Sequence, residues 1–143
     1  MLVSQILKDK GDMVFTAAPD ETMAAVAGQL HARRVGAIVV VSDGGEVVGI
    51  ISERDIVRAL AKDGPASLDQ TIDCCMTRDV IFATPGETVD SLLSRMTDRR
   101  IRHLPVVRDG RLAGIVSIGD LVKWKINEVE AEADGLKQYI AAG

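Results

Sequence analysis

Short apolar runs alternate along this chain with longer segments in which apolar residues recur every three or four positions. The two patterns are typical of buried strands and of amphipathic helices. Two of the runs, 49–51 and 114–116, begin at a glycine and lead directly into Ser-x-x-Asp. A serine followed three residues later by an acid predicts the start of a helix. Each place therefore predicts a strand, then a serine, then the first turn of a helix.

These two helix starts also suit the binding of an anion. The first turn of a helix presents free backbone N–H groups, and Ser52 or Ser117 adds a hydroxyl at the same point. The acid one turn further on, Asp55 or Asp120, is placed to accept hydrogen bonds from a ribose diol. Ser-x-x-Asp is equally an ordinary helix cap, so capping stays open as the alternative role of both acids.

The pattern occurs twice because the chain is duplicated. A shift of 66 positions aligns 14–43 with 80–109, and omitting Gly44 aligns 45–57 with 110–122. Ten of the first thirty pairs and six of the next thirteen are identical, which is more than two unrelated segments would share. Two copies are too few for a solenoid. We therefore expect a pseudo-symmetric pair in which each copy covers the apolar face of the other.

Each copy is expected to fold in the order β-α-β-β-α. A proline ends the first strand, a threonine three residues later caps the first helix, and an Asp-Gly turn joins the next two strands as a hairpin. Residues 2–7 and 71–76 are expected to be short helical lead-ins. The expected strands are 14–17, 37–42, 46–51, 80–83, 104–108 and 111–116, and the expected helices are 22–34, 52–62, 88–100 and one that begins at 117. Val26, Leu30, Leu92, Leu93 and Met96 are expected to face the core.

Beyond Asp120 the apolar residues keep helical spacing, which predicts one amphipathic helix to about residue 141, weakened at Gly135. A domain of this size cannot cover so long a helix, so we expect a partner chain and predict a homodimer. The expected fold class is α+β, with a first repeat at 1–64, a second repeat at 65–125 and a helical tail at 126–143.

Composition narrows the classes of function. The 143 residues are 47% hydrophobic but only 3% aromatic, so aliphatic side chains build the core. A net charge of −4 argues against a nucleic-acid or anionic-membrane partner, since both normally require a basic surface. The adjacent Cys74 and Cys75 do not form a CxxC motif and indicate a reducing cytoplasm. No Ser/His/Asp set, metal-ligand cluster or P-loop pattern is found, so we expect no enzyme activity and no obligatory cofactor.

The order of these motifs resembles the CBS-domain family, and in particular a stand-alone tandem CBS pair, or Bateman module. The resemblance covers nearly all of 3–125 and depends on motifs at 16–22, 49–55, 76–80, 84–88, 102–107 and 114–120. It implies an adenosine-containing ligand, such as AMP, ADP, ATP, NAD(H) or S-adenosylmethionine, in clefts between the repeats. In such modules the aspartate holds the ribose and the serine lies near the phosphates.

The resemblance also implies which residues form the two sites. The first would combine Ser52 and Asp55 with Val80, Ile81, Arg102, His103 and Leu104, and Arg54 would be a further cation near the phosphates. The second would combine Ser117 and Asp120 with Val14, Phe15, Gly36 and Ala37. No cation is close in sequence to the second site, so we expect the first to bind phosphates more tightly. For Arg102 and His103 the alternative is an exposed surface pair.

The function predicted from these features is that of a non-catalytic sensor module that binds an adenine nucleotide. One alternative is a structural dimeric module that binds a partner protein and has degenerate clefts. Another is a regulatory fragment that acts on a separate enzyme or transporter.

Overall fold

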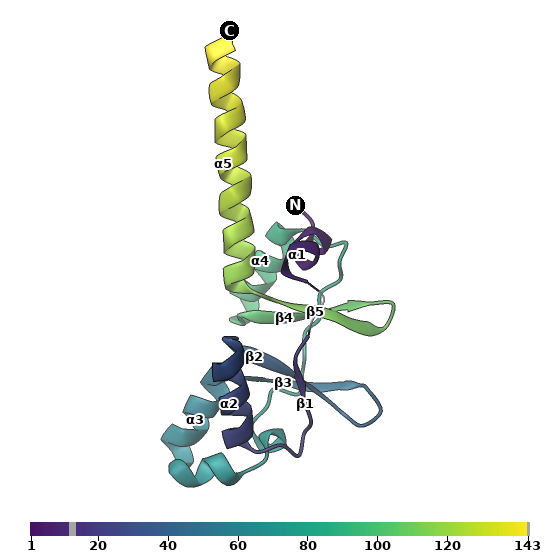
Figure 1. The fold of residues 1–143 in the computed structure, drawn as a ribbon, viewed down its shortest axis with the longest axis vertical. Helices are drawn as coiled ribbons and strands as arrows, with labels where there is room; N and C mark the ends of the chain where they lie inside the picture. Colours follow the sequence, from purple (N-terminus) through teal and green to yellow (C-terminus); the bar gives the residue numbers. More distant parts are fainter. Residues whose placement is uncertain (12–13, 143) are drawn as a thin grey trace. The chain divides into compact units, whose positions relative to one another are not determined.

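The computed structural model describes residues 1–11 and 14–142, which divide into two compact units. We call Val14–Ile81 the central unit, and Met1–Met13 together with Phe82–Gly143 the terminal unit. Each unit holds one copy of the repeat, as Figure 1 shows. In the described part of the chain, no helix is both long and apolar enough to cross a membrane.

The central unit contains a three-stranded sheet in the order β1-β2-β3. β1 (Thr16–Ala17) runs parallel to β2 (Ala37–Val41), and β2 is antiparallel to β3 (Val47–Ser52). Among the described residues of this unit are two α-helices, α2 (Met23–Arg33) after β1 and α3 (Glu53–Asp63) after β3. The predicted order β-α-β-β-α is therefore confirmed for the first copy.

Local chemistry fixes both ends of α2. The Thr22 hydroxyl accepts a hydrogen bond from the Ala25 N–H at 3.1 Å, as expected of an N-cap. At the other end Arg34 takes the left-handed conformation, with φ of 55°, and its N–H donates back to the Leu30 and His31 carbonyls. The second copy repeats this arrangement in α4 (Val89–Arg99), with Thr88 as the N-cap and Arg100 at φ of 54°.

The apolar faces of these elements meet in one core. Met23, Val26 and Leu30 of α2 are buried against the inward residues of the sheet, including Ile38 and Ile51. Each fully buried aliphatic side chain stabilises the fold by about 1.5–3 kcal/mol. Val26, Leu30, Leu92 and Met96 are buried as predicted, whereas Leu93 is only partly buried.

The terminal unit contains a two-stranded antiparallel sheet, β4 (His103–Arg108) with β5 (Arg111–Ser117). The predicted first strand at 80–83 is wrong, because only an isolated bridge joins Ala83 to Val106. Ala83 donates to the Pro105 carbonyl and accepts from the Val107 N–H, both at 2.9 Å. A longer parallel ladder needs an N–H at Pro105, which proline lacks. The first copy has Val39 at the equivalent place, so β1 forms there.

The lead-in segments are exchanged between the copies. The segment that precedes the first repeat forms α1 (Val3–Lys10) and packs in the terminal unit, where the Val3 N–H donates to the Glu87 carbonyl at 2.9 Å. The segment that precedes the second repeat packs in the central unit, where Ile72 donates to the Glu21 carbonyl at 2.9 Å. This segment contains two short 3-10 helices, η1 (Pro65–Asp69) and η2 (Ile72–Cys74). The repeat boundaries at 64 and 125 stay a prediction.

In each unit, a glycine of the third strand allows the lead-in segment to pack closely against the sheet. A Cβ on Gly114 would lie 2.6 Å from Cδ2 of Leu7 in α1. A Cβ on Gly49 would lie 2.6 Å from Sδ of Met76 and 2.9 Å from the Thr77 carbonyl oxygen. The two glycines occupy equivalent positions of the repeat, so both copies bring a lead-in to the same point of the third strand.

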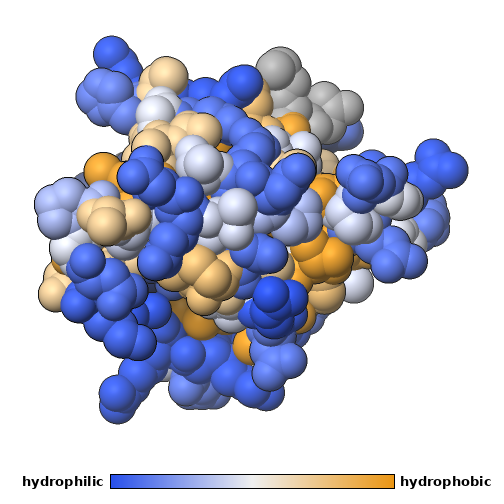
Figure 2. All heavy atoms as spheres, turned by 90° about the horizontal axis from the view of Figure 1, so that it is seen from below, coloured by the Kyte–Doolittle hydropathy of each residue, from blue (hydrophilic) through white to orange (hydrophobic). Residues whose placement is uncertain are grey.

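The chain ends in α5 (Ile118–Ala142), a continuous helix of 25 residues that Gly135 does not interrupt. Its first turns pack against α4, α1 and β5, and Leu121 is fully buried. The rest of α5 extends away from the other elements of the terminal unit (Figure 1). Figure 2 shows a surface on which hydrophilic residues predominate and hydrophobic residues form small patches.

Candidate functional site

Ser52 and Asp55 form a reciprocal cap at the start of α3. Asp55 Oδ2 accepts from the Ser52 N–H at 2.9 Å and from the Ser52 hydroxyl at 3.0 Å, while the Asp55 N–H donates to Ser52 Oγ at 3.3 Å. The second oxygen, Oδ1, accepts from Arg58 Nη1 at 3.2 Å. Asp55 is only 8% exposed. This carboxylate is therefore held in one orientation at the first turn of the helix.

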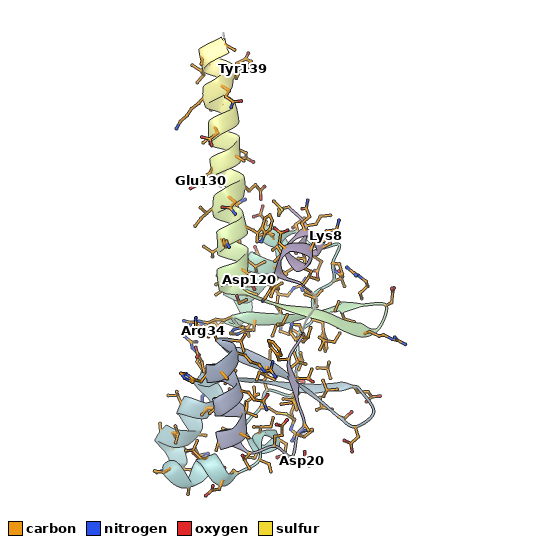
Figure 3. The ribbon with its side chains drawn as sticks, in the orientation of Figure 1. Lys8, Asp20, Arg34, Asp120, Glu130 and Tyr139 are labelled. Atoms are coloured by element: carbon orange, nitrogen blue, oxygen red, sulfur yellow. The ribbon has the colours of Figure 1, made fainter. Side chains whose placement is uncertain are left out.

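Ser117 and Asp120 repeat the cap at the start of α5, and a lysine from another element joins them. Asp120 Oδ2 accepts from the Ser117 N–H at 2.9 Å and from Lys10 Nζ at 2.6 Å. Lys10 Nζ also donates to the Ile115 carbonyl at 2.9 Å, which ties the end of α1 to β5. Figure 3 shows Asp120 at the base of α5, on the side where α1 lies.

The surroundings of Asp120 shift its protonation. Partial burial alone would raise the pKa of this carboxyl, because it penalises the charged form. The hydrogen bond from Lys10, the Ser117 N–H and the lysine charge outweigh that effect and lower the pKa below its ordinary value. Asp120 is therefore a stable anion at neutral pH, already paired with a cation of its own unit.

The start of the second strand adjoins the helix start within each unit. In the central unit the Glu53 N–H donates to the Gly36 carbonyl at 3.0 Å, and Ala37 lies opposite Ser52 in the sheet. In the terminal unit the Ile118 N–H donates to the Arg102 carbonyl at 2.8 Å, and His103 lies opposite Ser117. Each unit therefore brings together the start of its own second strand and its own Ser-x-x-Asp.

The central unit also has a surface hollow of about 610 Å³ beside this group. The C-terminal end of α2 and the start of α3 line it, through residues that include His31, Arg34, Gly36 and Glu53. Arg34 lies at the end of α2 (Figure 3). The hollow therefore combines the Arg34 cation with the N-terminal end of α3, both of which favour an anion, and the Glu53 carboxylate, which opposes one.

The comparisons with known proteins fit this duplicated architecture. The family model of the CBS domain matches residues 7–62 and again residues 71–127. The chain belongs to the CBS-domain family. A curated CBS relative, "CBS domain-containing protein CBSX3, mitochondrial" of Arabidopsis thaliana, is 34% identical over 149 aligned positions, which cover 99% of this chain and 72% of the relative. The crystal structure of the CBS-domain containing protein ATU1752 from Agrobacterium tumefaciens is 47% identical, with a TM-score of 0.84, and the match covers 85% of this chain and 91% of that one.

Two other similar CBS structures hold small molecules. The CBS domain pair of protein MJ0100, in complex with 5-methylthioadenosine and S-adenosyl-L-methionine, is 32% identical with a TM-score of 0.80 and covers 90% of this chain and 98% of its own. The CBS domain protein PAE2072 from Pyrobaculum aerophilum, complexed with AMP, is 28% identical with a TM-score of 0.75 and covers 84% and 89%. All three molecules contain adenosine.

The predicted site residues fall into two groups, one in each compact unit. Val14, Phe15, Gly36, Ala37, Ser52, Arg54, Asp55, Val80 and Ile81 belong to the central unit, and Arg102, His103, Leu104, Ser117 and Asp120 belong to the terminal unit. Ala37 and Leu104 are buried, whereas Arg54 and Arg102 are exposed. The predicted pairing of Ser52 and Asp55 with residues of the other CBS repeat stays a prediction.

Sequence reasoning missed four basic residues near these groups. Lys10 reaches Asp120 across more than a hundred positions, so no local pattern reveals the pair. Arg34 and His31, which line the hollow, resemble ordinary cations at a helix C-terminus. Arg33 is a stronger candidate for the binding site than its place in the sequence suggests. Its guanidinium lies 3.8 Å from the centre of the ring of Phe15, which is one of the predicted site residues.

Proposed function

We propose that this tandem CBS pair is a non-catalytic regulatory module that binds an adenosine-containing ligand. The observation that carries the proposal is the repeated group at the start of α3 and of α5, where a serine, an aspartate and a helix N-terminus meet the start of a strand. The adenosine-containing molecules bound by the similar structures of MJ0100 and PAE2072 support the choice of ligand class.

The proposed contacts use the carboxylate lone pairs that do not accept hydrogen bonds in the helix caps. A carboxylate offers about four acceptor positions, and in each copy Oδ2 serves the cap. Oδ1 is then the oxygen that accepts from a ribose hydroxyl. For Asp55 this oxygen also accepts from Arg58, so ribose binding shares or displaces that bond. The capping role and the ligand role are therefore compatible in one side chain.

The phosphate end of the ligand is proposed to lie near the helix N-termini and the neighbouring cations. In the central unit these cations are Arg34 of the hollow and Arg54. The location of the ligand between the two repeats, with Arg102 and His103 beside Ser52, is the part of the proposal that the family resemblance implies. Binding is proposed to act through the relative stability of two arrangements of the module, since a ligand shifts an equilibrium only by its differential affinity.

A regulatory role implies something to regulate. We propose that the module works in the cytoplasm as a homodimer and responds to AMP, ADP, ATP or NAD(H), with a separate enzyme or transporter as the client. The second candidate function is a structural module that binds a partner protein. The exposed apolar residues of α5, such as Ile126 and Leu136, favour that candidate.

Isothermal titration with AMP, ATP, NADH, S-adenosylmethionine and 5-methylthioadenosine tests the proposal. Wild type is expected to bind at least one of them, and chromatography after incubation is expected to recover the ligand unchanged. Asp55→Asn and Asp120→Asn each remove one charged acceptor, and we expect each to weaken its site roughly tenfold or more.

Asp98→Asn is the matched control, because it removes an exposed carboxylate of α4 outside both groups. It is expected to leave every affinity unchanged. The proposal fails if wild type binds none of the five compounds. It also fails if Asp98→Asn weakens binding as much as Asp55→Asn does.

A further inference from the structure

The outer part of α5 exposes a row of large apolar side chains. Ile126 is 52% exposed, Leu136 is 61% exposed and Ile140 is 69% exposed, whereas Leu121 at the start of the same helix is fully buried. Glu130 and Tyr139, labelled in Figure 3, lie on the part of α5 that extends away from the rest of its unit. A monomer would leave this row in water, which is unusual for a helix of a globular protein.

The row has the spacing of a coiled-coil seam. Its members are separated alternately by four and three positions, over the whole length of the helix beyond Leu121. They are Val122, Ile126, Val129, Ala133, Leu136 and Ile140, which we call the α5 seam. An amphipathic helix that lies on its own domain has a wider apolar face, whereas a strict alternation of four and three is typical of two helices that pack along one line.

The helix already uses its opposite face for its own unit. Leu121 is buried and Trp124 is partly buried, and both lie on the side of α5 away from the seam. The body of the terminal unit therefore supports the helix from behind and leaves the seam accessible from Val122 onward. The seam is left for an occupant outside the unit.

The charges beside the seam identify that occupant as a second copy of the same helix. In the heptad notation of coiled coils, the a positions of the seam are 126, 133 and 140, and the d positions are 122, 129 and 136. In a parallel pair, the residue that precedes an a position of one helix lies near the residue that follows the next d position of the other helix. This places Lys125 near Glu130 of the second copy, and Glu132 near Lys137 of the second copy. Both contacts join opposite charges, and twofold symmetry makes each of them twice.

An antiparallel pair with the same overlap gives the opposite result. It places Lys123 near Lys137 of the second copy, and it places Glu130 and Glu132 near their own symmetry mates. Every one of these contacts joins like charges, which is unfavourable. Antiparallel registers that avoid the repulsion are staggered by a heptad and lose two of the six layers of the seam.

We propose that α5 forms a parallel two-stranded coiled coil with α5 of a second copy, in register along the α5 seam. Isoleucine at the a positions 126 and 140 with leucine at the d position 136 favours two strands, whereas the valines at the other d positions, 122 and 129, do not add to that preference. Lys125 also pairs with Asp90 of its own unit at 3.0 Å, so it serves both the unit and the seam. The proposal is independent of nucleotide binding.

Disulfide trapping in the full chain tests the orientation. Cys74 and Cys75 are first replaced by serine, and Ala133→Cys is added at the middle of the seam. In the parallel register residue 133 faces its own copy, and facing a positions lie close enough for a disulfide. Ala133→Cys is therefore expected to form a covalent dimer under mild oxidation. Ala131→Cys, on the opposite face, is the matched control and is expected to stay mostly monomeric in denaturing gels.

A charge swap tests the register. Glu132→Lys alone and Lys137→Glu alone each place like charges across the seam, and sedimentation is expected to show a dissociation constant about tenfold weaker. The double variant Glu132→Lys with Lys137→Glu is expected to recover the wild-type value. In the antiparallel pair with full overlap, Lys137→Glu would strengthen the dimer instead, because it relieves the contact with Lys123.

Leu136→Asp tests the seam itself, with Ala131→Asp as its control at an exposed position of the same helix. We expect only Leu136→Asp to dissociate the dimer, with circular dichroism unchanged. A monomeric wild type, a trimer, a dimer indifferent to Leu136→Asp, or failure of Ala133→Cys to crosslink faster than Ala131→Cys would each overturn the proposal.

Discussion

Replacing Gly49 by alanine should damage the central unit far more than the equivalent change at Gly114 damages the terminal unit. The two glycines occupy the same position of the repeat, and each faces a lead-in segment. What differs is the atom that a new Cβ meets. At Gly114 it meets only a methyl group of Leu7 at 2.6 Å, with the next atoms 3.7 Å away or farther.

At Gly49 the new Cβ meets backbone as well as side chain. The Thr77 carbonyl oxygen would lie 2.9 Å away, and that oxygen accepts a hydrogen bond from the Ile50 N–H at 3.0 Å. The Thr77 N–H also donates to the Ile50 carbonyl at 2.9 Å, so relief of the clash requires both bonds to open. Overpacking costs about 1–3 kcal/mol, and alanine recovers about 0.5–1 kcal/mol over glycine in a strand. We expect Gly49→Ala to cost about 2 kcal/mol and Gly114→Ala to cost close to zero.

Urea unfolding followed by circular dichroism measures the difference. A slope of about 2 kcal/mol per molar urea converts a loss of about 2 kcal/mol into a midpoint lower by about 1 M. We expect that shift for Gly49→Ala and a shift within about 0.3 M of wild type for Gly114→Ala. Equal midpoints for the two variants, or a larger loss at Gly114, would refute the reasoning from backbone contact.

Two further predictions concern Lys10 and the helix ends. The folded pKa of Asp120 is lowered, so the Lys10 pair stabilises the protein at pH above the unfolded value of about 3.9, and this contribution is lost as the pH falls through the folded value. Lys10→Met should therefore melt below wild type at pH 7, and in thermal scans it should approach wild type as the pH falls through the lowered folded pKa of Asp120. A gap independent of pH would mean that Lys10 acts only by packing. Arg100→Gly should raise the free energy of unfolding by about 0.5–1 kcal/mol, because glycine adopts the positive φ of this position without strain. Arg99→Gly, one residue earlier within α4, should lower it by about 1 kcal/mol. Equal effects of the two variants in chemical denaturation would exclude that explanation.

The elements that depend on neighbouring residues were predictable from the sequence. The caps at Thr22 and Thr88, the hairpins and the Ser-x-x-Asp helix starts were predicted, because each depends on a few consecutive side chains. Pro105 explains why no strand forms near Ala83, but this could be inferred from the sequence only if the pairing of the two segments were already known. The local sequence therefore predicts the helices and strands, but whether a predicted strand forms depends on the segment with which it pairs.

Contacts between distant segments were not predictable. Nothing near Lys10 indicates that it will meet Asp120, and nothing in 71–77 indicates that this segment will pack on Gly49. The residues of the candidate site follow from the repeated motif and stay a prediction, and Arg34 of the neighbouring hollow was not among them. A duplicated sequence leaves open which copy supplies each partner, because both copies offer the same surface.

The exchanged lead-ins impose an order on synthesis. The central unit is one continuous stretch, so all of it is synthesised before the second part of the terminal unit, Phe82–Gly143. The terminal unit closes only when α1, made first, meets β5 and α5, made last. Because domains fold as units during synthesis, the central unit can fold while residues 1–11, which are made before it, still lack their partners β5 and α5. A chain that stops before β5 leaves α1 with an exposed apolar face.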